Sequence, residues 1–306
     1  MTTSTESLDS TNPAADHETL PTVGVVGLGA MGGAMASWLA ESGKPVHAMD
    51  NDPTARAHVA AGVKVHDDLA AIASECPVLI LSLPGPTQIQ EVVNQVLTLD
   101  DHVQPTVIID TSTSDPEVSV DLAARCEGKK IAYLDAPISG GQSGARTGTL
   151  TAFVGASDTA VERARPVLDA ITGGRWHHMG PVGTGHATKL VNNMLCAAHL
   201  VTAAEAVAIA RKCGVDPHRL IEALNQGSGR SAVTENNYPR WVLSDNFDSG
   251  FQFRLMARDT RLCLDVAARA GMTPQVLAVA GRAWAAAADD LSPDDDFNRV
   301  VQTIHP

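Results

Sequence analysis

The stretch VGVVGLGAMG at residues 23–32 decides the fold of this chain. It opens with a Val-rich run, which is typical of a strand buried on both faces of a parallel sheet. It closes with a G-x-G-x-x-G made by Gly27, Leu28, Gly29, Ala30, Met31 and Gly32. Glycines at these positions permit a tight turn, close approach of backbone to a pyrophosphate, and close packing of helix on strand. The stretch therefore predicts a dinucleotide-binding strand–helix unit.

An acidic residue follows at the distance that such a unit requires. Asp50 ends the next apolar run, VHAMD at 46–50, twenty-three positions after Gly27. A carboxylate there accepts hydrogen bonds from the adenosine ribose and repels a 2′-phosphate. The following residues, Asn51-Asp52-Pro53, place no arginine next door to receive that phosphate. NAD is favoured over NADP, with Asp50 and Asn51 as cofactor-binding candidates; the alternative is that Asp50 only caps the following turn.

Apolar runs alternate with helix-compatible segments between Thr22 and Pro181. The predicted strands are 23–27, 46–50, 78–83, 106–110, 131–135, 151–155 and 175–179. A helix is expected over 30–42, and Pro116 suits the first turn of another. This alternation predicts a doubly wound, mostly parallel sheet of the Rossmann type.

After Pro181 the sequence changes character. Residues 186–213 are Ala-rich and contain no Gly or Pro, so they predict one helix spanning about 42 Å at 1.5 Å per residue. Further helices are expected over 216–225, 254–270 and 274–288, with a short one at the end. We therefore expect a disordered leader over 1–20, an NAD-binding Rossmann domain over 21–183 and an all-α domain over 184–306.

Composition narrows the partners and the location. The 22 Lys and Arg against 35 Asp and Glu give a net charge of −13, which supplies no basic footprint for nucleic acid or an anionic membrane. No unbroken apolar run reaches the ~18 residues of a membrane span, and the first twenty residues lack the apolar core of a secretory signal. The cysteines are scattered and indicate buried thiols in a reducing compartment: Cys76, Cys126, Cys196, Cys213 and Cys263. We predict a cytoplasmic protein with no nucleic-acid or membrane partner and no metal.

Three loops follow predicted strands at the end where an open α/β sheet binds its ligands. Leu83 and Pro84 lie in one, and Thr113 lies in another. In the third, Ser139-Gly140-Gly141 can present several backbone N–H groups to a carboxylate. On the loops alone, ordinary turn chemistry is an equally good reading.

The long predicted helix carries a lysine in apolar surroundings. Lys189, Asn192 and Asn193 are spaced i, i+3 and i+4, so they share one face. A buried lysine costs several kcal/mol unless it is paired or deprotonated. Desolvation lowers a lysine pKa, as a general acid or base near neutrality requires. The alternative is a snorkelling lysine beside two capping amides.

Four motifs combine these features: GLGAMGGAMA (27–36), DAPISGGQSGARTGTLTAFVG (135–155), GTGHATKLVNN (183–193) and GFQFRLMARD (250–259). Together, and in this order, they resemble the β-hydroxyacid dehydrogenase family. The resemblance implies hydride transfer between NAD(P), with NAD preferred, and a small 3-hydroxy acid or its semialdehyde or ketone. It also implies a homodimer or homotetramer with the long helix at the subunit interface.

The resemblance assigns roles to individual residues. It implies Lys189 as general acid and base, Ser139, Gly140 and Gly141 as the carboxylate loop, Asn193 as the amide on the substrate, and Thr113 as a hydroxyl on the cofactor. One position departs from the family, because Arg258 stands where a lysine is usual. Arginine keeps the charge near the cofactor, but it differs in geometry and cannot titrate. Arg230, in a glycine-rich segment, is a candidate for a second substrate group or else an ordinary surface arginine.

Two other classes share this architecture. Imine reductases and reductive aminases typically lack the carboxylate loop and replace the lysine, whereas this chain retains both. Non-catalytic reader proteins of the same fold lose the lysine and carry basic segments. Lys189 and the acidic balance of the chain therefore favour the dehydrogenase.

Overall fold

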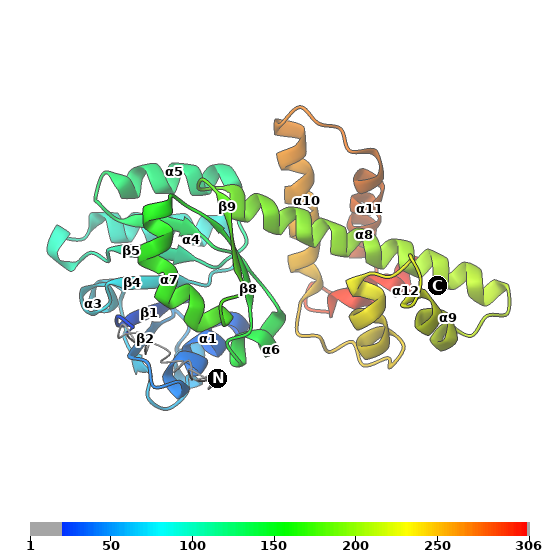
Figure 1. Ribbon diagram of the computed structural model, residues 1–306, viewed down its shortest axis with the longest axis horizontal. Helices are drawn as coiled ribbons and strands as arrows, with labels where there is room; N and C mark the ends of the chain where they lie inside the picture. Colours follow the sequence, from blue (N-terminus) through cyan, green and yellow to red (C-terminus); the bar gives the residue numbers. More distant parts are fainter. Residues whose placement is uncertain (1–19, 305–306) are drawn as a thin grey trace, which may run out of the picture.

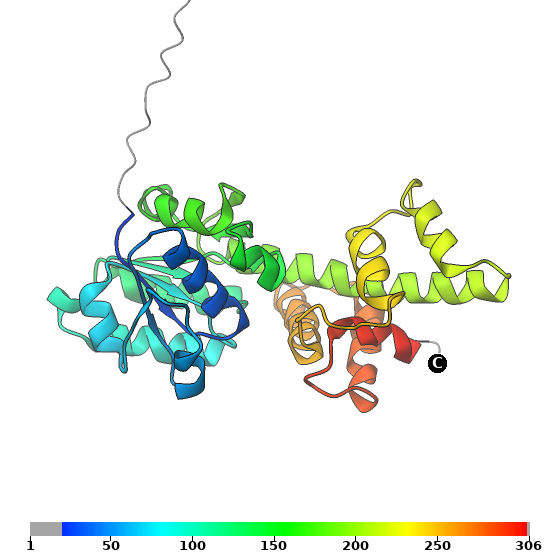
Figure 2. The same ribbon diagram turned by 90° about the horizontal axis from the view of Figure 1, so that it is seen from below.

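The structure is a computed structural model that describes residues 20–304. The predicted leader lies outside the described residues, apart from Leu20. Figure 1 shows a layered α/β part and a separate group of helices, with α8 (Thr184–Lys212) running from one into the other. Turning the view by 90° shows the helical group packed on both sides of α8 (Figure 2).

One sheet organises the first part of the chain. Its strands are β1 Val23–Val26, β2 Val46–Met49, β3 Lys64–Val65, β4 Val78–Leu81, β5 Val107–Asp110, β6 Ala132–Asp135, β7 Ile138–Ser139, β8 Thr151–Gly155 and β9 Trp176–Gly180. They lie in the order β3-β2-β1-β4-β5-β6-β8-β7, with β9 beside β8. Strands β1 to β6 pair in parallel, while β8 runs antiparallel to β6 and β7. The predicted doubly wound, mostly parallel sheet is confirmed.

Two strands were missed by sequence reading. Strands β3 and β7 have two residues each, which is too short for any periodic pattern to register. Strand β7 lies at the end of the sheet, against β8, and ends at Ser139. It thereby places the predicted carboxylate loop at the edge of the sheet.

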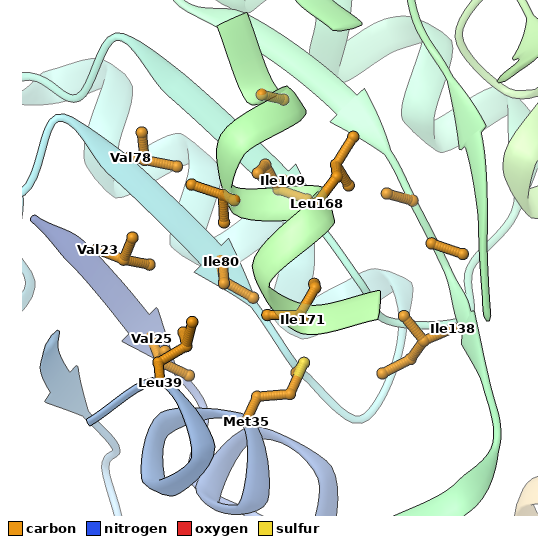
Figure 3. Packing of buried hydrophobic residues seen from close by; sticks show 14 of the residues in the cluster. Val23, Val25, Met35, Leu39, Val78, Ile80, Ile109, Ile138, Leu168 and Ile171 are labelled. Carbon is orange, nitrogen blue, oxygen red and sulfur yellow. The ribbon is translucent and has the colours of Figure 1, made fainter. Parts of the chain in front are cut away.

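Helices cover both faces of this sheet. They are α1 Ala30–Glu41, α2 Pro53–Ala57, α3 Leu69–Glu75, α4 Pro86–Thr98, α5 Pro116–Glu127, α6 Gly141–Arg146 and α7 Asp158–Thr172, with a 3-10 turn over Asp101–Val103. Strand β4 shows the division, since Val78 and Ile80 face one apolar cluster while Leu79 and Leu81 face the other. Figure 3 shows the first cluster, where Leu39 of α1 and Ile171 of α7 close over the strands.

The second part is helical, as predicted. After α8 come α9 Pro217–Leu224, a π-helix over Val233–Val242, α10 Phe253–Arg269, α11 Gln275–Ala286, 3-10 turns over Ala287–Asp289 and Phe297–Arg299, and α12 Val300–Ile304. The predicted long helix starts two residues early, at Thr184, and so includes Gly185. The π-helix was not predicted because Pro239, which lacks an N–H, lies inside it.

By length and composition alone, α8 is long and apolar enough to cross a membrane, and it is the one such helix among the described residues. Its contacts give it another role. It packs against β8, α10 and α11, and its buried residues include His186, Lys189 and Asn193. The prediction of buried thiols is wrong for Cys213, which is exposed just after α8 ends, and Cys196 is only partly buried.

Candidate active site

The glycine loop combines glycines that the fold requires with one that it does not. Gly27 has a φ of +93°, and a Cβ there would lie 2.3 Å from the Ser82 carbonyl oxygen. A Cβ on Gly32 would lie 1.9 Å from the Gly27 carbonyl oxygen, whereas one on Gly29 would meet no atom of residues 20–304 within 4 Å. Gly29 thus borders open space at the N-terminus of α1, where no side chain caps the helix. Free N–H donors beside open backbone fit a bound pyrophosphate.

The other residues of the loop are of two kinds, those that are exposed and those whose side chains are buried or packed against the apolar cluster. Ala30 is exposed with Gly29, while Leu28 is buried and Met31 packs against the apolar cluster beneath α1. The backbone N–H of Leu28 donates to Asp50 Oδ2 at 2.6 Å. Side-chain packing of Leu28 and Met31 therefore holds the loop, which leaves its exposed backbone for a ligand.

Asp50 is placed at the end of β2 with its carboxylate turned to the glycine loop. Besides the bond from Leu28, its Oδ1 accepts the Asp52 N–H at 2.8 Å, so it also caps the turn, while Asn51 beside it is exposed. The expectation that no arginine lies near Asp50 is wrong for the folded chain. Arg56 of α2 donates to the Asp50 carbonyl oxygen at 2.6 Å, because one turn of helix folds it back.

The loops after β4 and β5 are tied to each other. The Leu83 N–H donates to Ser112 Oγ at 2.9 Å, and Thr113, next along, is half-buried. The Pro84 carbonyl oxygen accepts a hydrogen bond from Arg258 Nη1 of the helical part. Leu83, Pro84 and Thr113 thus lie at the carboxyl ends of neighbouring strands, on the side where the glycine loop opens.

Lys189 lies in the second turn of α8 and is 9% exposed. Burial lowers the pKa of its ammonium group below the usual range, and the carboxylate of Asp259 opposes that shift. A lysine whose neutral form is favoured in this way accepts and returns a proton at lower pH than an exposed lysine, which suits a general acid and base.

Asp259 of α10, whose charge acts on Lys189, accepts hydrogen bonds from neighbouring polar groups. Its Oδ2 accepts from Asn193 Nδ2 at 2.7 Å, and Asn192 in turn donates to Asn193 Oδ1 at 3.1 Å. Its Oδ1 accepts from Arg258 Nε at 2.9 Å and Nη2 at 2.7 Å. Arg258 thereby connects α10 to the Pro84 loop, beside a cavity of about 290 Å³. Sequence reading gave Asp259 no role, although it closes the fourth motif.

A buried polar network fixes the start of α8. Asp135, at the end of β6, accepts the N–H groups of Gly183 and His186, each at 2.7 Å. The His186 ring shares a 2.6 Å hydrogen bond with Ser119 Oγ, and its Nε2 lies 3.1 Å from the Ser112 carbonyl oxygen. Burial raises the pKa of Asp135 to about 6, against the opposing charge of His186. The network was not predicted, but it positions Lys189 one turn further along.

The predicted carboxylate loop has the backbone shape that a nest of donors requires. Gly140 and Gly141 have φ values of +122° and +63°, and both are exposed. Helix α6 starts here, and no side chain of the described part of the chain caps it. Ser139, half-buried, ends β7 beside them.

For Arg230 the alternative role, that of an ordinary surface arginine, has direct structural support. Its side chain is 63% exposed and pairs with Glu235 at 3.6 Å, at the start of the π-helix. Within the described chain this pair joins it to the helical part rather than to the Lys189–Asp259 cluster.

Two family descriptions match consecutive parts of the chain. Residues 22–180 match the family described as the NAD binding domain of 6-phosphogluconate dehydrogenase. Residues 183–304 match the family described as NAD-binding of NADP-dependent 3-hydroxyisobutyrate dehydrogenase. Both descriptions name NAD binding, and the second also names NADP.

Individual relatives span nearly the whole chain. The 2-(hydroxymethyl)glutarate dehydrogenase of Eubacterium barkeri is 34% identical and covers 88% of this chain and 92% of its own length. A structure of Mycobacterium tuberculosis 3-hydroxyisobutyrate dehydrogenase with L-serine is 32% identical, covers 94% of this chain and all of its own, and superposes with a TM-score of 0.85. An imine reductase from Pseudomonas sp. is 18% identical with a TM-score of 0.61, which shows the shared fold alone.

The fold and its glycine loop define an NAD-binding oxidoreductase with a helical second half. The chain belongs to the β-hydroxyacid dehydrogenase family, as its four motifs indicated. The prediction of an NAD-dependent 3-hydroxyacid dehydrogenase is confirmed at the level of the family.

Proposed function

We propose that this enzyme interconverts a small 3-hydroxy acid and its semialdehyde or ketone, with Lys189 as the general acid and base. The observation that carries the proposal is the burial of Lys189 on α8 opposite Asp259. We also propose that residues 21–183 form the NAD-binding domain and 184–306 the substrate domain, meeting at the Asp135-anchored start of α8.

The cofactor is held by residues of the first domain together with Arg258 of the helical part. The glycine loop would take the pyrophosphate, Asp50 and Asn51 the adenosine ribose, and Leu83, Pro84, Thr113 and Arg258 the nicotinamide end. The nicotinamide ring, when bound, supplies the hydride acceptor or donor. NAD is preferred because the Asp50 carboxylate repels a 2′-phosphate.

Lys189 moves the proton that accompanies hydride transfer. In oxidation its neutral amine takes the proton from the substrate hydroxyl. In reduction its ammonium group gives a proton to the developing alkoxide oxygen. Proton transfer by a positioned side chain is typically worth about 10²–10⁴-fold in rate.

The substrate is oriented by groups that recognise a carboxylate and a hydroxyl. The backbone of Gly140 and Gly141 and the Ser139 hydroxyl would bind the carboxylate. Asn193, held at 2.7 Å by Asp259, would hydrogen-bond the substrate beside Lys189. Arg230 is proposed for a further polar group of a larger substrate.

The assembly is a homodimer or homotetramer, with α8 at its interface. Val191, Leu195 and Ile209 of α8 are exposed by 45% or more. An apolar groove of about 380 Å³, lined by Val120, Val182 and Ala187 among others, lies at the start of the same helix. Burial of such surface favours association. A cytoplasmic location stays a prediction.

A panel of 3-hydroxy acids, each tested with NAD at alkaline pH by NADH absorbance, tests the proposal. At least one member should be oxidised, and Lys189→Ala should bind NAD but turn over at least about 10²-fold more slowly. NADH oxidation by cyclic imines, with no response to 3-hydroxy acids or short semialdehydes, would instead identify an imine reductase.

A further inference from the structure

Two histidines and a glutamate meet at the β3 edge of the sheet, away from the proposed active site. His47 comes from β2, His66 follows β3, and Glu75 ends α3. One ligand-type atom from each lies within 4.8 Å of the others. His47 Nδ1 lies 3.0 Å from His66 Nε2 and 3.8 Å from Glu75 Oε2.

These separations are close to those of a metal's ligand shell. Ligands about 2.0–2.1 Å from a tetrahedral Zn²⁺ ion lie roughly 3.3–3.4 Å from one another. The two separations measured from His47 Nδ1 differ from that value by less than about half an ångström, and the third pair, His66 and Glu75, lies within 4.8 Å. Two imidazoles and one carboxylate, with a fourth position open to water, are a donor set that suits zinc and its neighbours in the first transition row.

The surroundings favour ligation over an ordinary surface contact. The side chains of His47 and Glu75 are 14% and 43% exposed, and His66 is buried. Burial lowers the pKa of His47, and the neighbouring His66 lowers it further, so the imidazole is available in the neutral form that a metal binds. The rings are tilted by 37° with centroids 4.9 Å apart. The two nitrogens share a hydrogen bond at 3.0 Å, which binding of a metal ion would replace.

A cation already approaches this carboxylate. Lys64 Nζ donates to Glu75 Oε2 at 2.5 Å, and Lys64 is the strand partner of His47. The Lys64 side chain is 55% exposed, so it can swing into water without loss of packing. An ammonium group held here shows that the site attracts positive charge, and it would compete with a metal ion.

We propose that His47, His66 and Glu75 form a binding site for a divalent transition-metal ion, with Zn²⁺ as its simplest occupant. The ion would join β2 to the residue after β3 and to the end of α3, two elements that already pack against β2. His47 lies three positions before Asp50, so the site would brace the strand that carries the ribose-binding carboxylate. Sequence reading predicted no metal, because the ligands come from three elements with no recognisable spacing.

The test uses the full chain without an affinity tag, stripped with a chelator and titrated with Zn²⁺ by calorimetry. We expect about one ion per chain. A ligand at about 100 times its Kd stabilises a native protein by about 2.7 kcal/mol, which corresponds to a rise in Tm of about 5 °C or more. Co²⁺ should give the visible absorption of a low-coordinate site.

Variants decide which residues hold the ion. Glu75→Gln, at a half-exposed position that leaves the core intact, should weaken Zn²⁺ binding at least about tenfold, and His66→Ala should do the same. Lys64→Met should strengthen binding, because it removes the competing ammonium group. His58→Ala, an exposed histidine of the same part of the chain, is the matched control and should bind as the wild type does. Absence of saturable binding, or equal affinity in Glu75→Gln and wild type, would overturn the proposal.

Discussion

Asn193 of α8 and Asp259 of α10 are joined by a 2.7 Å hydrogen bond, although 66 residues separate them in the chain. Asp259 is 1% exposed and also receives two donors of the Arg258 guanidinium. A buried carboxylate therefore orients the amide proposed for the substrate, and its charge acts on Lys189. One residue thereby links substrate orientation to proton affinity.

The first prediction concerns that charge. Asp259→Asn keeps an oxygen that can accept from Asn193, but it removes the negative charge that raises the pKa of Lys189. Burial then acts unopposed by Asp259, and the lysine pKa falls further. We expect the acidic limb of the pH profile of kcat/KM for oxidation to move to lower pH. Kinetics across the pH range, with Asp290→Asn as a control at an exposed acid of the helical part, measure this shift. A limb that stays in place would mean that Lys189 is not the titrating group.

The second prediction separates catalysis from stability. Lys189→Met should reduce turnover at least about 10²-fold while leaving NAD affinity within a few-fold. The native state holds Lys189 with a lowered pKa, so the unfolded chain binds its proton more tightly. That penalty is largest below the folded-state pKa and disappears as pH rises to the unfolded value near 10.4. At neutral pH the variant should therefore be as stable as wild type or about 1 kcal/mol more stable.

Denaturant unfolding at several pH values measures this difference. The advantage of Lys189→Met should shrink as pH rises. Lys212→Met, at the exposed end of the same helix, should change neither activity nor its pH dependence. A variant clearly less stable than wild type at neutral pH would contradict a net cost for burying the lysine.

The conformation of the glycine loop could be predicted from sequence because its determinants are local. Each step from β1 through Gly27 and Gly32 into α1 depends on neighbours in the chain, and Asp50 follows at a fixed distance. The strand boundaries were predicted within a few residues for the same reason, since a buried parallel strand is a continuous apolar run.

Contacts between distant segments could not be predicted in this way. The turn of α2 that returns Arg56 to Asp50 depends on where a short helix points. The role of Asp259 depends on α10 packing against α8, which no periodicity in either helix specifies. Strand β7 depends on its pairing with β8, and the Asp135–His186 network depends on the packing of α8 against β6 and β8. Each of these is a property of tertiary packing.

The third prediction concerns cofactor choice. The Asp50 carboxylate accepts from Leu28 and Asp52, and Arg56 lies against its carbonyl oxygen. Asp50→Asn removes the charge that opposes a 2′-phosphate while Arg56 remains within reach. We expect the ratio of kcat/KM with NADP to that with NAD to rise at least about tenfold, the effect of about 1.4 kcal/mol. Initial rates with both cofactors measure the ratio.

A neighbouring acid provides the control for this change. Asp67 pairs with Arg56 at 3.7 Å but is 94% exposed, so Asp67→Asn should leave the ratio near that of wild type. If the NADP-to-NAD ratio of kcat/KM rose equally in both variants, the effect would come from the negative charge of the surface as a whole and not from Asp50 itself. An unchanged ratio in Asp50→Asn would count against a ribose-binding role for Asp50.

The last prediction concerns the departure at Arg258. Its guanidinium donates to the Pro84 carbonyl oxygen and to Asp259 Oδ1 together, so one side chain holds the helical part against the loop after β4. Arg258→Lys keeps the charge, but a single ammonium group lacks the planar fork that spans both acceptors. Binding should weaken while Lys189 and Asn193 keep their places, so KM for cofactor or substrate should rise several-fold with kcat changed less. Arg254→Lys, on the exposed side of the same helix where it pairs with Asp294, is the control. A large fall in kcat with KM unchanged would instead place Arg258 in the chemical step.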